Sequence, residues 1–88
     1  MTGPAGDVIL AAMADDLLLD LQGLRCPLPV LRAQKALRSL APGACIVVLA
    51  TDPGAVKDFA AFAEASGHRL LESSEANGIY RFRLERRA

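Results

Sequence analysis

The sequence predicts a two-layer α/β (α+β) sandwich, in which a mixed four-stranded sheet carries two helices on one face. Two segments with helical spacing of apolar residues alternate with short apolar runs typical of strands, in the order β-α-β-α-β-β. Right-handed crossovers make the first three strands parallel and place both helices on one face if the connections do not switch sides. Asn77-Gly78 is a strong hairpin signal, and it adds an antiparallel fourth strand.

The first half of the chain holds two expected strands and one helix. Residues 17–21 are a short apolar run that Gly23 ends. Residues 27–40 predict a helix that Pro42-Gly43 stops. Its apolar residues recur at helical spacing: Val30, Ala33, Leu37 and Leu40. Residues 45–50 are apolar on both faces, as in a central strand.

The second half begins with another helix signal. Asp52-Pro53 pairs an N-cap acceptor with a proline at the first helical position, and Gly67 is a typical helix-ending residue. The expected buried stripe of this helix comprises Val56, Phe59, Ala60 and Ala63. Residues 68–76 and 79–85 flank the hairpin turn, and the last strand alternates apolar residues with arginines.

Helices on one face would leave alternate residues of the central strand, Val47 and Leu49 or their neighbours, on the open face. Such a patch is either a docking surface or part of an ordinary half-covered sheet.

The 88 residues suffice for one small domain, which we expect over residues 17–88, preceded by a flexible arm over residues 1–16. No apolar run approaches the roughly 18 residues of a spanning helix. The apolar stretch Val8–Ala14 follows an aspartate and no basic residue, so it is a poor secretory signal. We therefore expect a cytoplasmic protein.

The formal net charge is zero, but the charges are unevenly distributed. No acidic residue occurs between Gln22 and Thr51. The same block contains four basic residues: Arg25, Arg32, Lys35 and Arg38. They form either a solvated helix face or a positive field near Cys26 that docks a partner. A nucleic-acid-binding module is a further hypothesis, but few aromatic residues and zero net charge argue against it.

The two cysteines, Cys26 and Cys45, are too few for a disulfide framework. With one histidine, the chain cannot build a four-ligand zinc site from Cys and His alone. There is also no glycine-rich phosphate loop and no pair of carboxylates at a recognisable spacing. We therefore expect no metal and no cofactor.

Cys26 carries the strongest chemical signal, because it lies just before a helix and is followed by two alternating prolines. Pro27 fits the first helical position, and Pro29 lies within the first turn, whose N–H groups have no helical partner. The positive helix end and Arg25 both favour an anion, so we expect a lowered pKa for the Cys26 thiol. The thiolate is the nucleophile in sulfur exchange.

Other polar residues have more ordinary explanations. Asp52 follows the second strand at the same sheet edge as Cys26, so it lies near Cys26 or simply caps its own helix. Cys45 is interpreted as a packing residue of the central strand. His68 is interpreted as a surface or edge residue.

Residues 23–30, Gly-Leu-Arg-Cys-Pro-Leu-Pro-Val, resemble the Cys-Pro-x-Pro signature of the TusA/SirA-like sulfur-carrier proteins. The likeness covers roughly residues 17–85. It includes further positions: Lys35, Arg38, Pro42-Gly43, Asp52-Pro53, Asp58 and Gly67-His68. The resemblance implies a sulfurtransferase that accepts sulfane sulfur on Cys26 from a cysteine desulfurase or a rhodanese-like donor and passes it to an acceptor protein thiol.

Family pathways include tRNA thiolation, molybdenum cofactor maturation and sulfur oxidation. The tRNA-thiolation members carry an acidic residue where this chain has Leu28, which weakens that particular assignment. An alternative function is a thiol redox or regulatory switch, which would pair Cys26 with Cys45.

Overall fold

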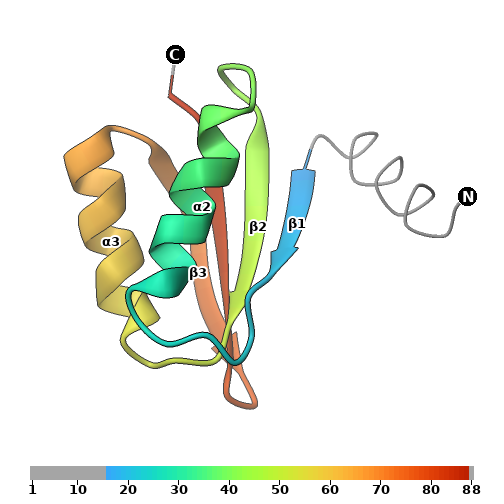
Figure 1. The fold of residues 1–88 in the computed structure, drawn as a ribbon, viewed down its shortest axis with the longest axis vertical. Helices are drawn as coiled ribbons and strands as arrows, with labels where there is room; N and C mark the ends of the chain where they lie inside the picture. Colours follow the sequence, from blue (N-terminus) through green and yellow to red (C-terminus); the bar gives the residue numbers. More distant parts are fainter. Residues whose placement is uncertain (1–15, 88) are drawn as a thin grey trace, which may run out of the picture.

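The computed structural model describes residues 16–87 and has four strands and two helices in the predicted order (Figure 1). The elements are β1 (Asp16–Asp20), α2 (Leu28–Arg38), β2 (Cys45–Ala50), α3 (Ala55–Ser66), β3 (Arg69–Ala76) and β4 (Ile79–Glu85). The first strand begins one residue earlier than expected. The rest of the expected arm lies outside the described residues.

The four strands form one mixed sheet in the order β1-β2-β4-β3. β1 and β2 pair in parallel, and β4 runs antiparallel to both of its neighbours. The last strand therefore lies between β2 and β3, while β3 keeps the same direction as β2. This order follows from polarity, because β3 is mostly exposed and polar and suits an edge, whereas β4 buries Phe82 and Leu84.

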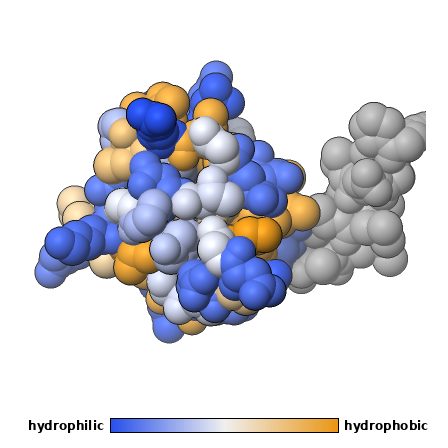
Figure 2. Space-filling view, turned by 90° about the horizontal axis from the view of Figure 1, so that it is seen from below, coloured by the Kyte–Doolittle hydropathy of each residue, from blue (hydrophilic) through white to orange (hydrophobic). Residues whose placement is uncertain are grey.

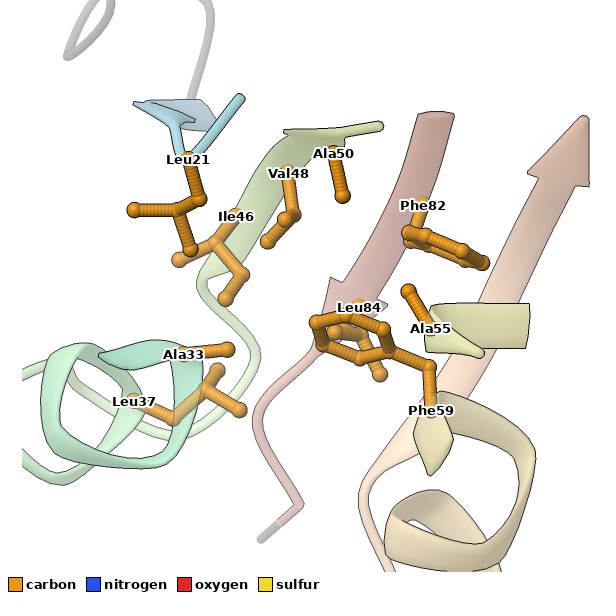
Figure 3. Packing of buried hydrophobic residues seen from close by; sticks show 10 residues of the cluster. All are labelled: Leu21, Ala33, Leu37, Ile46, Val48, Ala50, Ala55, Phe59, Phe82 and Leu84. Atoms are coloured by element: carbon orange, nitrogen blue, oxygen red, sulfur yellow. The ribbon is translucent and has the colours of Figure 1, made fainter. Parts of the chain in front are cut away.

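Both helices cover the same face of the sheet, which confirms the predicted fold class (Figure 1). The core lies between the two layers, where side chains from β2 and β4 point toward those of the helices (Figure 3). The rings of Phe59 in α3 and Phe82 in β4 stack with their centroids 4.5 Å apart. This contact joins the second helix to the middle of the sheet.

The expected buried stripe of α3 was partly wrong. Phe59 is fully buried, but Val56 is 39% exposed and Ala60 is also exposed. The helix instead buries Ala55, which lies one turn before Phe59. The face that packs on the sheet carries Ala55 and Phe59, with Phe62 and Ala63 packed against the core, at helical spacings of three and four. In α2 the expected Ala33 and Leu37 are buried.

The open face of the sheet carries the alternate residues of β2. Ile46 and Val48 point toward the helices, so Val47 lies on the other face. Val47 is nevertheless only 5% exposed. Arg83 lies opposite Val47 in the ladder, and its guanidinium reaches the Asp16 carboxylate at 3.2 Å. Long charged side chains thus line this face.

The loops that leave β1 and β2 lie side by side where both helices begin (Figure 1). The Leu21 N–H donates to the Leu49 carbonyl oxygen at 2.8 Å, which extends the pairing past the end of β1. The Gly23 N–H donates to Thr51 Oγ1 at 2.9 Å. These two bonds hold the loop containing Cys26 against the loop that precedes α3.

Candidate functional site

Cys26 is exposed in the loop between β1 and α2. The helix begins at Leu28, so Pro27 is the N-cap residue, and the expectation that Pro27 is the first helical residue was off by one. Pro29 occupies the second helical position and is buried, whereas Pro27 is exposed. Pro29 therefore anchors the start of α2, because it fills core space where a missing N–H costs nothing.

Asp52 joins the two loops through its carboxylate. Oδ2 accepts a hydrogen bond from the Cys26 N–H at 2.6 Å, and Oδ1 accepts one from the Gly54 N–H at 2.9 Å. Of the two roles left open by the sequence, the contact with Cys26 is the one observed. Asp52 is not the N-cap of α3; that position is Gly54, and no side chain caps the helix.

The pKa of the Asp52 carboxyl is lowered, chiefly because it accepts the backbone hydrogen bonds from Cys26 and Gly54. The charge of Arg25 lowers it further. Arg25 therefore acts on Asp52, which in turn holds the backbone of the cysteine. Hydrogen bonds that are made to the ionised carboxylate explain this direction.

Asp58 is a site residue that the sequence reasoning did not single out. It lies in the first turn of α3, and its Oδ2 accepts a hydrogen bond from Cys26 Sγ. The one signal in the sequence was its match to the family pattern. Its proximity to Cys26 arises because α3 begins beside the Cys26 loop, which sequence spacing does not reveal.

The expectation of a lowered pKa for the Cys26 thiol was wrong, because its pKa is raised. The largest cause is the hydrogen bond to Asp58, followed by partial desolvation of the thiol and by the negative charges of Asp58 and Asp52. The expectation rested on the helix end and Arg25. It gave no weight to the negative charge of Asp52 and did not place Asp58 beside the thiol. A neighbouring negative charge that accepts the thiol proton stabilises the protonated form.

Gly54 forms one wall beside the sulfur. A Cβ atom at this position would lie 3.5 Å from Cys26 Cβ and 3.8 Å from Sγ. These are ordinary contact distances, so alanine fits, but a larger side chain would extend over the sulfur. Glycine therefore keeps this side of the thiol open.

Exposed apolar residues surround the site together with basic ones. Leu28 is 41%, Leu31 50% and Val56 39% exposed. Figure 2 looks onto the end of the molecule where both helices begin and shows apolar patches separated by hydrophilic residues. Arg32 is exposed further along α2, and Lys35 is exposed in its last turn, about 10 Å along the axis from Leu28.

Arg38 is exposed too, but it ends α2, about 15 Å along the axis from Leu28. It therefore lies away from the thiol.

Cys45 lies far from this site. It opens β2, and about 17 Å of strand separates it from Ala50, near the loop that contacts Cys26. Its thiol is buried and lies 3.9 Å from the Gly43 carbonyl oxygen. A disulfide needs Cα atoms within about 7 Å, so Cys26 and Cys45 do not bridge. This arrangement agrees with a packing role for Cys45.

His68 is also remote, at the opposite end of α3. Its Nδ1 accepts a hydrogen bond from the Arg87 N–H at 3.0 Å, and its ring lies 5.7 Å from that of Phe62. Burial lowers the pKa of the imidazole, and the charges of Arg86 and Arg87 add to this. The histidine thus holds the backbone of Arg87 in place and does not contact Cys26.

Among residues 16–87, no group of three or more His, Cys, Asp or Glu side chains is arranged to hold a metal ion. No helix in this part of the chain is long and apolar enough to cross a membrane.

The model of the family described as Sulfurtransferase TusA matches residues 18–86. A sulfur carrier protein TusA from Allochromatium vinosum is 51% identical over 75 residues, covering 84% of this chain and 99% of the relative. A sulfur carrier protein TusA from Pseudomonas paraeruginosa is 40% identical over 73 residues, covering 83% and 92% respectively.

Among solved structures, a SirA-like protein from Desulfitobacterium hafniense has a similar fold. Its TM-score is 0.72 at 28% identity, and the match covers 82% of this chain and 99% of that one. The family match includes Cys26 and both residues that contact it, Asp52 and Asp58. The chain belongs to the TusA sulfurtransferase family.

Proposed function

We propose that the chain is a sulfur carrier that accepts sulfane sulfur as a persulfide on Cys26 and relays it to the thiol of an acceptor protein. The observation that carries this proposal is the exposed Cys26 thiol, which two loops and a carboxylate hold at the tip of α2. The relatives named sulfur carriers support the same role. The protein acts stoichiometrically, one sulfur atom at a time.

The chemistry is an exchange between sulfur atoms. Cys26 Sγ attacks the outer sulfur of the donor persulfide, a new S–S bond forms, and the S–S bond of the donor breaks. The donor leaves as a thiol, and the Cys26 proton passes to it through solvent. In the second transfer, the acceptor thiol attacks the outer sulfur of the Cys26 persulfide, the S–S bond of Cys26 breaks, and Cys26 leaves as a thiol. Atoms and electrons balance without any cofactor.

The surroundings of the thiol suit a protein partner. Leu28, Leu31 and Val56 supply exposed apolar area, and Arg32 and Lys35 supply positive charge on α2. We infer that donor and acceptor present an apolar patch flanked by acidic residues, because opposite charges steer association. A cysteine desulfurase or a rhodanese-like protein is the proposed donor class. Free thiols persist in the cytoplasm, which is the proposed location.

The redox-switch alternative has no structural support within the chain. It requires the Cys45 thiol, which is buried at the far end of β2. Pairing with Cys26 would require the two thiols to come together over about the length of β2.

The test is mass spectrometry after incubation of the protein with a cysteine desulfurase and cysteine. We expect a gain of one sulfur atom on Cys26 in the wild type and in Cys45→Ser. Cys26→Ser should stay unmodified while keeping its fold. A wild type that gains no sulfur, or a Cys26–Cys45 disulfide in its place, would contradict the carrier role.

A further inference from the structure

Two carboxylates form hydrogen bonds with Cys26, which is unexpected for a residue that must carry a negatively charged sulfur. Asp58 Oδ2 accepts the proton of Cys26 Sγ in a hydrogen bond, and Asp52 accepts the N–H of the same residue. A carrier that held sulfur tightly would surround it with positive charge. Here the group in direct contact with the sulfur is negative.

We propose that Asp58 sets the balance between the unloaded and the loaded carrier: its carboxylate binds the thiol form of Cys26 and disfavours the persulfide anion. Cys26 would then hold sulfur weakly and give it up readily. The inference rests on the proposed function and adds the regulation of the same site.

The unloaded state is stabilised by the hydrogen bond. When Sγ attacks a donor persulfide, its proton leaves through the Asp58 carboxylate to solvent, and the donor thiolate takes up a proton as it departs. For a low-molecular-weight donor, glutathione persulfide and the Cys26 thiol give glutathione and the Cys26 persulfide. The exchange needs no oxidant, and its equilibrium depends on how each form of Cys26 interacts with Asp58.

The loaded state lacks this stabilisation. Sγ is now bonded to the outer sulfur about 2.05 Å away, so it has no proton to donate to Asp58. The outer sulfur of an ionised persulfide carries a negative charge, which the Asp58 carboxylate repels. The charged groups that act on Sγ are Asp58 from α3 and Asp52 from the preceding loop, while Arg25 acts on Asp52. The outer sulfur is therefore directed away from α3, toward solvent and a docked acceptor.

The experiment measures the loaded fraction of Cys26 by mass spectrometry at equilibrium with fixed ratios of glutathione persulfide to glutathione. Asp58→Asn keeps the shape of the side chain and removes its charge. We expect the loading equilibrium constant to rise about tenfold, the change that accompanies weakening of a hydrogen bond to a charged group. The pH midpoint of iodoacetamide alkylation should fall in the same variant, because the thiol loses the carboxylate that accepts its proton.

Glu64→Gln is the matched control, because it removes the same charge from an exposed position about 9 Å further along α3. It should load and alkylate like the wild type. Asp58→Ser provides a second variant, and circular dichroism verifies that each variant is folded.

Equal loading of wild type and a folded Asp58 variant would overturn the inference and leave the carrier role intact. An equal rise in Asp58→Asn and Glu64→Gln would also overturn it, since net charge alone would explain the change. A wild type that takes no sulfur from glutathione persulfide or from the desulfurase would instead overturn the proposed function.

Discussion

Phe59 connects the helix that carries Asp58 to the centre of the sheet, so its removal tests the fold and the site together. Its side chain is fully buried, and its ring stacks on Phe82 at 4.5 Å. Phe59→Ala deletes this contact and leaves a cavity between α3 and β4. The neighbouring Asp58 then loses the support that holds its carboxylate against Cys26.

The magnitude follows from the buried area. A buried phenylalanine removes about 200 Å² from water, which at about 25 cal/mol per Å² gives roughly 5 kcal/mol as an upper bound. Measured losses for Phe→Ala in cores are about 3–5 kcal/mol. A domain of this length has a free energy of unfolding of roughly 4–13 kcal/mol. The variant should therefore be marginally stable or unfolded at 37 °C.

The assay is urea unfolding followed by circular dichroism, with Phe59→Leu as the intermediate variant. Phe59→Leu keeps most of the volume, and we expect it to cost about 1–2 kcal/mol. Val56→Ala is the control, because Val56 is 39% exposed on the same helix and should change stability by less than about 1 kcal/mol. A loss below about 1.5 kcal/mol for Phe59→Ala would refute the stacked packing of α3 on β4.

Three other predictions concern the loops and the surface. The pKa of Asp52 is lowered in the folded state, so its contribution to folding stability is present above the pKa of the unfolded state and is lost as the pH falls through the pKa of the folded state. Asp52→Asn should therefore weaken the dependence of the urea midpoint on acidic pH. Gly67→Ala should lower the melting temperature more than Gly43→Ala does. Both glycines have positive φ, but a Cβ added at position 67 would lie 3.1 Å from Arg87 Cδ, whereas one at position 43 meets nothing within 4 Å. Equal losses would contradict this. Arg32→Glu with Lys35→Glu should weaken donor binding in calorimetry, most strongly at low salt, and unchanged affinity would remove this face from the interface.

Much of the fold was predictable because local patterns and global packing agree. The apolar run of β2 and the Asn77-Gly78 turn each predicted an element that the structure contains. The stripe of α3 was partly misplaced, because a spacing of three or four residues from Phe59 fits both Val56 and Ala55, and only Ala55 is buried. The expected helix start at Asp52-Pro53 was also too early, since the helix begins at Ala55. The position of β4 between β2 and β3 was not predicted, since hairpin signals give pairing and not the order of strands in a sheet.

The element order and the placement of both helices on one face follow from local patterns in the sequence, because spacing and crossover handedness act over short stretches of chain. The prediction of Cys26 as the reactive residue also rests on local information, a short motif before a helix. The surroundings of the thiol, by contrast, depend on how distant segments pack together. Asp52 and Asp58 lie 26 and 32 residues away along the chain, yet both reach Cys26 because parallel strands bring their following loops to one edge. Those two carboxylates reverse the expected direction of the thiol pKa, since electrostatic effects depend on distance in space and not on distance in sequence.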